Sequence, residues 1–274
     1  MNEIVLSALA LGVLGAICAV VLFFVAKKFD VPENPQVEEI NNLLPQANCG
    51  ACGQAGCKQF ALQIVDKQGL EGLYCPVGGQ ILMERIASKL GVSSEVRERK
   101  VAVIRCQGSR EAAPDKIDYH LVSSCRLRHQ QNCGMTACPH GCLRGGDCVR
   151  VCKFGALYFD EVKGLPIVIE EKCTSCGACL KACPRLLFEL RTAKDKVYVA
   201  CMNQEKGAIA KKNCSHACIG CQKCVRLVAN PELALMNENL AILKEGLDPK
   251  VLGEQLAQAC PTKAILNKKE KGSV

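Results

Sequence analysis

The chain has 274 residues, of which 22 are cysteines, 11 are aromatic and none is tryptophan. A cysteine content of about 8% is typical of chains held together by metal sites or disulfides. The scarcity of aromatic side chains argues against a large aromatic-lined substrate domain, and 49% hydrophobic residues argue against a disordered chain. The formal charge of +8 counts every cysteine as neutral. We interpret the excess of Lys and Arg as compensation for negative charge buried at the cysteines, rather than as a sign of nucleic-acid binding.

The first segment, 1–29, is predicted to be a single transmembrane helix. Residues 4–26 are 23 consecutive uncharged residues, which as a helix extend about 35 Å, enough to cross a hydrocarbon core. Glu3 precedes this run and Lys27 and Lys28 follow it, whereas a cleavable signal peptide has its positive charge in front. Positive charge after the span places the rest of the chain in the cytoplasm. Cytoplasmic cysteines stay reduced, so they are expected to bind metal rather than form disulfides.

Changes in composition divide the remainder of the chain. We expect a linker at 30–36, a small helical domain at 37–90, a polar connector at 91–100, a cysteine-rich domain at 101–270 and a tail at 271–274. Within the cysteine-rich domain, VAVIRC at 101–106 is echoed by VYVAC at 197–201. We interpret this echo as a duplicated unit of cysteine group plus short strand.

The small helical domain contains one group of four cysteines, Cys49, Cys52, Cys57 and Cys75. Glycines at 50, 53 and 56 let backbone N–H groups approach cluster sulfurs. A helix beginning near Gly56 would present its N-terminus to an anionic cluster. The group predicts one [4Fe–4S] cluster, with a structural zinc site as the alternative.

The most specific pattern in the chain is Cys173-x2-Cys176-x2-Cys179-x3-Cys183-Pro184. In bacterial ferredoxins this run gives three cysteines to one [4Fe–4S] cluster and the fourth to a neighbouring cluster. A looser partner lies upstream, at Cys138, Cys142, Cys148 and Cys152. Exchange of the fourth cysteines predicts one cluster on Cys138, Cys142, Cys148 and Cys183 and another on Cys152, Cys173, Cys176 and Cys179. The two would form a bacterial ferredoxin core at 134–190.

The remaining cysteines suggest up to two more clusters. Three ligands come from Cys218, Cys221 and Cys224, and the distant Cys260 supplies the fourth, since Val228 stands where a complete run would have its own. A fifth set joins the cysteines that close the two echoing strands to two others: Cys106, Cys125, Cys201 and Cys214. Cys133 is then the preferred spare, and Cys18 a small apolar residue of the span.

These groups predict at least three [4Fe–4S] clusters, and four or five if the later groups are complete. Each set of four thiolates around a [4Fe–4S]2+ core carries −2, so five sets change the formal charge from +8 to about −2. The expected fold class is α+β: one N-terminal transmembrane helix, a small helical [4Fe–4S] domain and ferredoxin-like polycluster domains.

No catalytic site is expected in this chain. The sequence has no Gly-rich dinucleotide or phosphate loop following a strand and no Gly-x-Ser-x-Gly elbow. The histidines, His120, His129, His140 and His216, are scattered, and Asp115, Asp118 and Tyr119 form no catalytic constellation. The chain is therefore predicted to move electrons without making or breaking substrate bonds.

The order of these features resembles the B subunit of the Rnf complex, the ion-translocating ferredoxin:NAD oxidoreductase. The resemblance is carried by the N-terminal span, then CGACGQAGC and Cys75-Pro76-Val77-Gly78-Gly79, then ferredoxin repeats. The domain at 37–90 also resembles the four-cysteine domain of corrinoid iron–sulfur proteins. The sequence departs from the longer members of the family at Arg110 and Val228, where further cysteines are expected.

This resemblance implies an electron-transfer subunit of a membrane-bound oxidoreductase complex. It would accept electrons from reduced ferredoxin and relay them towards NAD, coupled to Na+ or H+ transport. Its implied partners are soluble ferredoxin and the membrane subunits that carry flavin and the NAD site, with no nucleic acid. The implied location is the inner (cytoplasmic) membrane, as a single-pass protein with its bulk in the cytoplasm. The alternatives are a stand-alone membrane-anchored polyferredoxin carrier that serves another reductase, and a zinc-holding structural protein.

Overall fold

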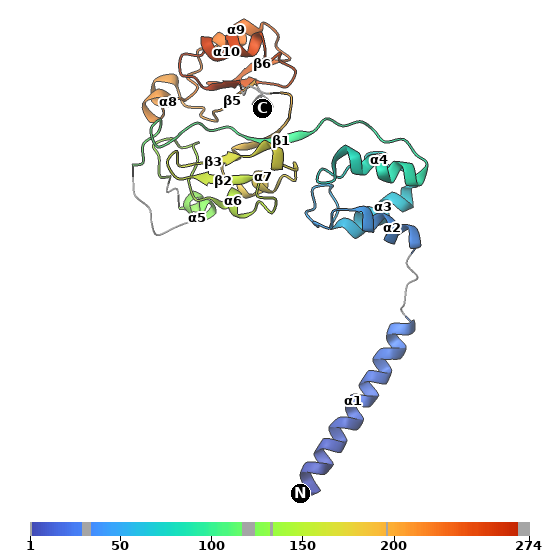
Figure 1. Cartoon of the computed structure of the whole chain (residues 1–274). Coiled ribbons are helices and arrows are strands. Elements are labelled where there is room, and N and C mark those ends of the chain that lie inside the picture. The colour runs from blue at the N-terminus through green and yellow to red at the C-terminus, as the bar shows by residue number, and fades with distance from the viewer. Residues whose placement is uncertain (1, 29–33, 117–123, 132–133, 196, 268–274) are drawn as a thin grey trace.

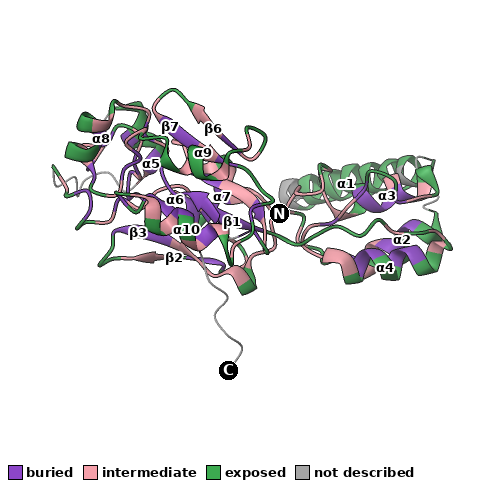
Figure 2. Ribbon diagram, turned by 90° about the horizontal axis from the view of Figure 1, so that it is seen from above, coloured by how far each residue is buried: buried purple, intermediate pink, exposed green. Residues whose placement is uncertain are grey.

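The computed structural model describes residues 2–28, 34–116, 124–131, 134–195 and 197–267. Helix α1 (Asn2–Lys28) projects away from the rest of the chain in Figure 1. Its segment Val5–Val25 is long and apolar enough to cross a membrane, and none of it is buried against the protein. Figure 2 shows this helix exposed along its length. An apolar surface on every side of a helix suits a lipid surrounding better than water.

Three helices, α2 (Pro35–Leu43), α3 (Cys57–Lys67) and α4 (Gly79–Leu90), follow as one small unit. Their apolar positions recur every three to four residues and bury one core, which includes Ile40, Phe60, Ile64 and Met83. The side chain of Asn34 caps α2 by accepting the N–H of Gln36 at 3.0 Å. The periodicity seen at 37–90 therefore forms helices, as expected.

The cysteine-rich region is built from two similar halves. The first contains β1 (Lys100–Ile104), α5 (Cys125–Gln130), α6 (Asp147–Arg150), β2 (Leu157–Asp160), β3 (Leu165–Val168), the 3-10 turn η1 (Glu170–Lys172), α7 (Ala178–Ala182) and β4 (Phe188–Thr192). The second contains β5 (Val197–Val199), α8 (Gly207–Asn213), α9 (Lys223–Val228), β6 (Ala234–Asn237), β7 (Leu240–Leu243), α10 (Leu252–Ala259) and β8 (Ile265–Asn267).

The strand pairing repeats between the halves. In each half the first strand pairs antiparallel with the last, β1 with β4 and β5 with β8. A hairpin lies between them in the chain, β2–β3 or β6–β7. A short helix precedes each hairpin and each closing strand. The echo in the sequence therefore marks the opening strand of each half.

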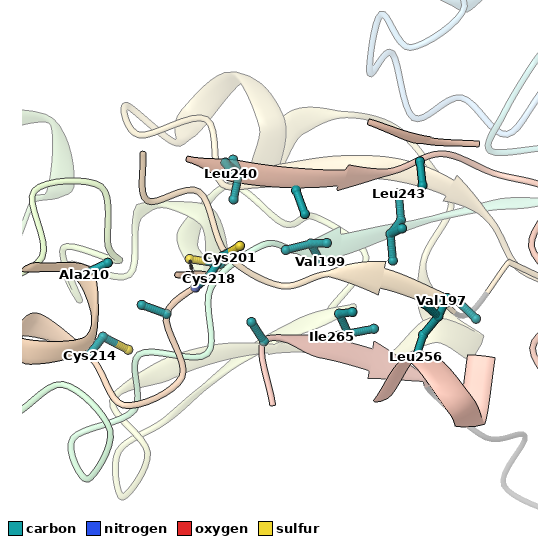
Figure 3. Packing of buried hydrophobic residues seen from close by; sticks show 14 of the residues in the cluster. Val197, Val199, Cys201, Ala210, Cys214, Cys218, Leu240, Leu243, Leu256 and Ile265 are labelled. Carbon is teal, nitrogen blue, oxygen red and sulfur yellow. Dashed lines mark hydrogen bonds between the residues drawn. The ribbon is translucent and has the colours of Figure 1, made fainter. Parts of the chain in front are cut away.

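Each half has its own small core. In the second half, Val197, Val199, Leu240, Leu256 and Ile265 pack together beside cysteines (Figure 3). In the first half the corresponding core contains Ala102, Leu157 and Phe188, again packed against cysteines. Cysteine side chains form part of both cores: Cys201, Cys214 and Cys218 belong to the core of the second half, and Cys148 and Cys179 to that of the first.

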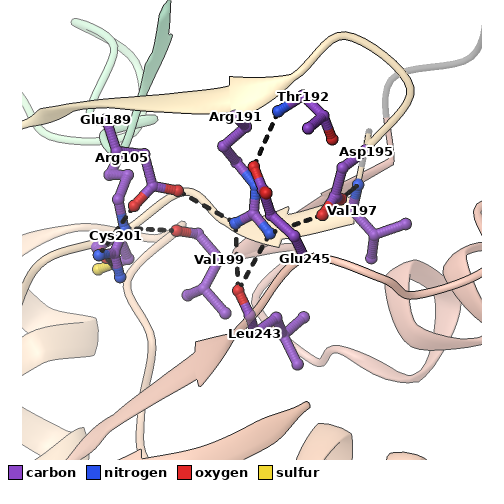
Figure 4. A network of polar contacts seen from close by, with 10 residues as sticks. All are labelled: Arg105, Glu189, Arg191, Thr192, Asp195, Val197, Val199, Cys201, Leu243 and Glu245. Atoms are coloured by element: carbon purple, nitrogen blue, oxygen red, sulfur yellow. Dashed lines mark hydrogen bonds and ion pairs between the residues drawn. The ribbon is translucent and has the colours of Figure 1, made fainter. Parts of the chain in front are cut away.

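A polar network joins the two halves (Figure 4). The buried guanidinium of Arg191 on β4 donates to the Asp195 carboxylate at 3.1 Å and to the Leu243 carbonyl at 3.1 and 3.2 Å. Arg105, after β1, donates to the Val199 carbonyl at 3.3 Å. These bonds hold the end of β7 and strand β5 against the first half.

Candidate cluster-binding sites

Five cavities lie among the cysteines, and every described cysteine outside α1 lines one of them. We name them by their cysteines: cavity A, Cys49, Cys52, Cys57 and Cys75; cavity B, Cys152, Cys173, Cys176 and Cys179; cavity C, Cys125, Cys142, Cys148 and Cys183; cavity D, Cys106, Cys138, Cys201 and Cys214; cavity E, Cys218, Cys221, Cys224 and Cys260. Cys142 also borders cavity D. Their volumes, including the space at their mouths, lie between about 320 and 380 Å³. Similar size and at least four cysteines at each cavity indicate one kind of occupant.

Cavity A is formed by the loop before α3 and by Cys75 ahead of α4. The loop turns through left-handed backbone at Asn48 (φ 44°) and Gly53 (φ +85°). The Asn48 side chain accepts the N–H of Cys57 at 2.8 Å and so fixes the start of α3. The predicted helix start near Gly56 is found here, with α3 beginning at Cys57.

In cavity B the fourth cysteine comes from the upstream run of cysteines, in the arrangement that the spacing predicts. Cys173, Cys176 and Cys179 come from the loop before α7 and from α7 itself, and Cys152 follows α6. Gly177 at the start of α7 has φ +72°, which allows the tight turn between the second and third cysteines.

The structure groups Cys125 and Cys138 differently from the spacing. Cys125 lies in cavity C with Cys142, Cys148 and Cys183, and Cys138 lies in cavity D. The expected sets had these two cysteines the other way round.

Polar contacts explain both placements. Just before α5, Ser124 donates its hydroxyl to the Asp147 carboxylate, and the N–H of Arg126 donates to the same oxygen, each at 3.1 Å. Cys125 is thereby held beside Cys148, the neighbour of Asp147. Cys138 is instead contacted by the amide of Asn203, whose Nδ2 lies 3.5 Å from its Sγ, next to Cys201.

In every cavity, backbone N–H groups point at cysteine sulfurs. Five such donor–acceptor pairs, one per cavity, are Gly78 to Cys75, Ala102 to Cys173, Leu187 to Cys183 and Gly108 to Cys106 at 3.4 Å, and Ala264 to Cys260 at 3.3 Å. Donors of this kind stabilise negative charge on sulfur.

The cavities are poor surroundings for free thiolates. Burial raises the pKa of Cys75, raises that of Cys148, Cys179 and Cys201 to about 12, and raises that of Cys224 to about 11. Neighbouring cysteines add to the shift in each case. Four ionised sulfurs in one cavity therefore require a positively charged core between them.

The distances between the cysteine sulfurs indicate whether a single metal ion or a four-iron cluster fits the cavities. Among the described residues, no three His, Cys, Asp or Glu side chains converge closely enough to share one metal ion. A tetrahedral zinc site brings its sulfurs to about 3.8 Å from one another, because Zn–S bonds are about 2.3 Å long. A four-iron core holds them further apart. The cysteine sets therefore fit [4Fe–4S] clusters better than single zinc ions.

Four of the cavities form a continuous series. Cys148 of cavity C interacts electrostatically with Cys179 of cavity B, and Cys142 lines both C and D. The N–H of Cys218, in cavity E, donates to Cys201 of cavity D at 3.3 Å. The series is therefore B–C–D–E. Arg99, on the segment that leads from cavity A, donates to the carbonyls of Glu171 and Cys173 at 3.1 and 3.4 Å, beside cavity B.

Other residues singled out in the sequence lie outside these sets. His140 and His216 line cavity D, while Asp115 forms ion pairs with Arg110 and Arg144. Cys18 lies exposed on α1, and His129 lies on α5. The predictions for Cys133, Asp118, Tyr119 and His120 concern positions outside the described residues.

Sequence reasoning missed several polar residues at the cavities, three of which lie close to cysteine motifs. Asn203 contacts Cys138, Arg144 lies buried beside cavity D, and Arg185 lines cavity C. The only signal in the sequence was that each of these residues lies close to a cysteine motif. That position does not indicate whether the side chain points towards a cavity.

Comparison with known proteins points the same way. Residues 44–71 match a family described as "Putative Fe-S cluster", and residues 166–186 match "4Fe-4S binding domain". The chain is 40% identical over 218 residues to the B subunit of the Na(+)-translocating ferredoxin:NAD(+) oxidoreductase complex of Acetobacterium woodii, covering 80% of this chain and 65% of that protein. It is 38% identical to the B subunit of the ion-translocating oxidoreductase complex of Methanosarcina acetivorans, covering 82% and 84% of the two chains. It is 33% identical to the B subunit of the proton-translocating ferredoxin:NAD(+) oxidoreductase complex of Clostridium ljungdahlii, covering 97% and 93%.

Proposed function

We propose that this chain, which belongs to the B-subunit family of ion-translocating (Rnf-type) oxidoreductase complexes, relays electrons one at a time through [4Fe–4S] clusters in cavities A to E. The family membership agrees with the resemblance read from the sequence. The observation that carries the relay is the unbroken series B–C–D–E, in which neighbouring cavities share a cysteine or are joined by cysteine contacts.

A bound [4Fe–4S] cluster supplies one-electron redox chemistry, with no proton transfer required at the iron. The chain's own residues bind the clusters, stabilise their reduced state and exclude water. The cysteines of each cavity hold the cluster, and the N–H groups aimed at their sulfurs favour the reduced, more negative state. Apolar residues around the cavities, such as Leu157 and Phe188, keep water away from the path.

The partners and the location are part of the proposal. The electron donor would be a reduced ferredoxin, and the acceptors would be membrane subunits that carry flavin and lead to NAD, coupled to Na+ or H+ transport. Helix α1 would hold the chain in the membrane as a single span, and Lys27 and Lys28 at its end favour the cytoplasmic side for the cavities. The A. woodii and C. ljungdahlii relatives are named as subunits of ferredoxin:NAD(+) oxidoreductase complexes, one sodium-translocating and one proton-translocating.

Iron and acid-labile sulfide per chain, measured on the anaerobically purified full chain, test cluster binding. Five [4Fe–4S] clusters correspond to about 20 iron and about 20 sulfide. Zinc without sulfide would overturn the proposal. About 16 of each would remove one cavity from the relay.

The Cys173→Ala variant tests the relay itself. We expect membranes with this variant to lose ferredoxin-dependent NAD reduction while the chain stays inserted. Full activity in the variant would contradict the relay. Co-purification with several membrane proteins distinguishes a complex subunit from a free-standing polyferredoxin, which would be isolated alone.

A further inference from the structure

Arg185 lies at cavity C, on the side of Cys142, the cysteine that also borders cavity D. Its side chain lines cavity C, two residues after Cys183. Burial lowers the pKa of Arg185, and cysteines from both cavities oppose that shift, Cys138 of cavity D and Cys183 of cavity C most strongly. A single positive charge therefore lies close to both cysteine sets.

Two donors of this guanidinium have no acceptor. Nε and Nη1 of Arg185 are buried, and no hydrogen-bond partner exists for them among the described residues. An unsatisfied buried donor is costly, above all on a charged group. Arg144, which interacts electrostatically with Cys106 of cavity D, also has a buried Nε without a partner among the described residues. It differs from Arg185 because it pairs with the Asp115 carboxylate and donates to the Gly108 and Ala113 carbonyls at 2.9 Å. Arg144 is neutralised by a carboxylate, whereas no carboxylate among the described residues forms an ion pair with Arg185.

The turn that holds Arg185 exposes an apolar side chain and points a charged one towards the interior, which is the reverse of the usual arrangement. Leu186, the next residue, is 70% exposed and has left-handed backbone at φ 51°. Its N–H donates to the Cys183 carbonyl at 3.1 Å, and the N–H of Leu187 donates to the Cys183 sulfur at 3.4 Å. The turn thus exposes a leucine and directs a cation inwards. Local strain of this sort is typical of functional positions.

We propose that Arg185 is an electrostatic tuning residue, whose charge and free N–H donors serve the clusters of cavities C and D and raise their reduction potentials. This inference rests on the proposed cluster binding. Reduction takes a cluster with its four thiolates from −2 to −3, so a fixed cation beside it stabilises the reduced form more than the oxidised form. Because one cation acts on both clusters, it raises both reduction potentials at the middle of the series B–C–D–E.

The test is a redox titration of the full chain in detergent, followed by electron paramagnetic resonance, for Arg185→Met and Arg185→Lys. Iron and sulfide are counted on the same samples. The matched control is Arg226→Met, since Arg226 also lies two residues after a cavity cysteine but is exposed on α9. We expect Arg185→Met to make reduction of two clusters at least tenfold less favourable, which is about 59 mV for a one-electron couple. The lysine variant should shift less and the control hardly at all.

The iron count separates the possible failures. A full count with unchanged potentials in Arg185→Met overturns the tuning role and leaves cluster binding intact. Equal shifts in the lysine and methionine variants overturn the charge argument. If both variants lose iron equally, Arg185 is a structural residue and the inference fails. A wild-type chain without iron and sulfide instead overturns the proposed function.

Discussion

Pairs of alanine substitutions that include Cys125 or Cys138 test how the structure distributes the cysteines among the cavities. In the structure this residue shares cavity C with Cys148, while Cys138 lies in cavity D. The sequence spacing groups Cys138 with Cys148 and places Cys125 elsewhere. A single substitution removes one cluster under either grouping, so each single variant should fall from about 20 to about 16 iron. Only pairs of substitutions separate the two groupings.

The two groupings predict different iron counts for double variants. If both substitutions fall in one cavity, the loss should stay at about four iron, whereas two cavities should lose about eight. The structure therefore predicts about 16 iron for Cys125→Ala/Cys148→Ala and about 12 for Cys138→Ala/Cys148→Ala. The sequence grouping predicts the reverse. Cys173→Ala/Cys179→Ala is the control, since both groupings put these residues in one set.

The assay is iron and acid-labile sulfide per chain after anaerobic purification, with spectra of the reduced protein to count the remaining clusters. The reasoning is refuted if Cys125→Ala/Cys148→Ala loses about eight iron while Cys138→Ala/Cys148→Ala loses about four. Loss of every cluster in the control pair would show instead that the cavities are not independent of one another.

Two further predictions concern the scaffold. Arg191→Met leaves the buried Asp195 carboxylate without its partner, so we expect the free energy of unfolding to fall by about 3–5 kcal/mol; a urea midpoint equal to that of the unmodified chain would contradict this. At Gly220 (φ +66°) an added Cβ would lie 2.9 Å from the Asn239 carbonyl oxygen, so Gly220→Ala should displace the loop of cavity E and lower the iron count by about four. Gly155→Ala, at φ +59° with open space around the new atom, is the matched control and should keep its iron.

Local patterns predicted much of this fold. The uncharged run at 4–26 forms α1, and the periodic segments of 37–90 form α2, α3 and α4. The two echoing apolar runs became the opening strands of two similar halves. These features are local, because helix periodicity and strand runs depend on residues close in sequence. The bounds of the predicted domains remain predictions.

The cysteine sets show which parts of the site can be predicted from the spacing of cysteines in the sequence. Where a set is nearly contiguous, as in Cys173, Cys176 and Cys179, the tight turn at Gly177 keeps the cysteines together, and the structure places them in one cavity. Cavity E also matches its predicted set, because α10 and β8 return Cys260 to the earlier loop. The ligand role of all these residues is part of the proposal.

Cys125 and Cys138 are different because the local backbone, α5 for Cys125 and a turn closed by Gly141 for Cys138, does not decide which cavity each one joins. Their places depend on bonds between distant segments, from Ser124 to Asp147 and from Asn203 to Cys138. A cysteine far from its set along the chain can join either of two neighbouring cavities, and side-chain contacts of this kind decide between them. Arg185 belongs to the same class, because its direction is set by the turn after Cys183 and not by its own identity. The route of electrons through C and D thus depends on tertiary contacts, and so substitution of Ser124, Asp147 or Asn203 should disturb that route even though none of them is a cysteine.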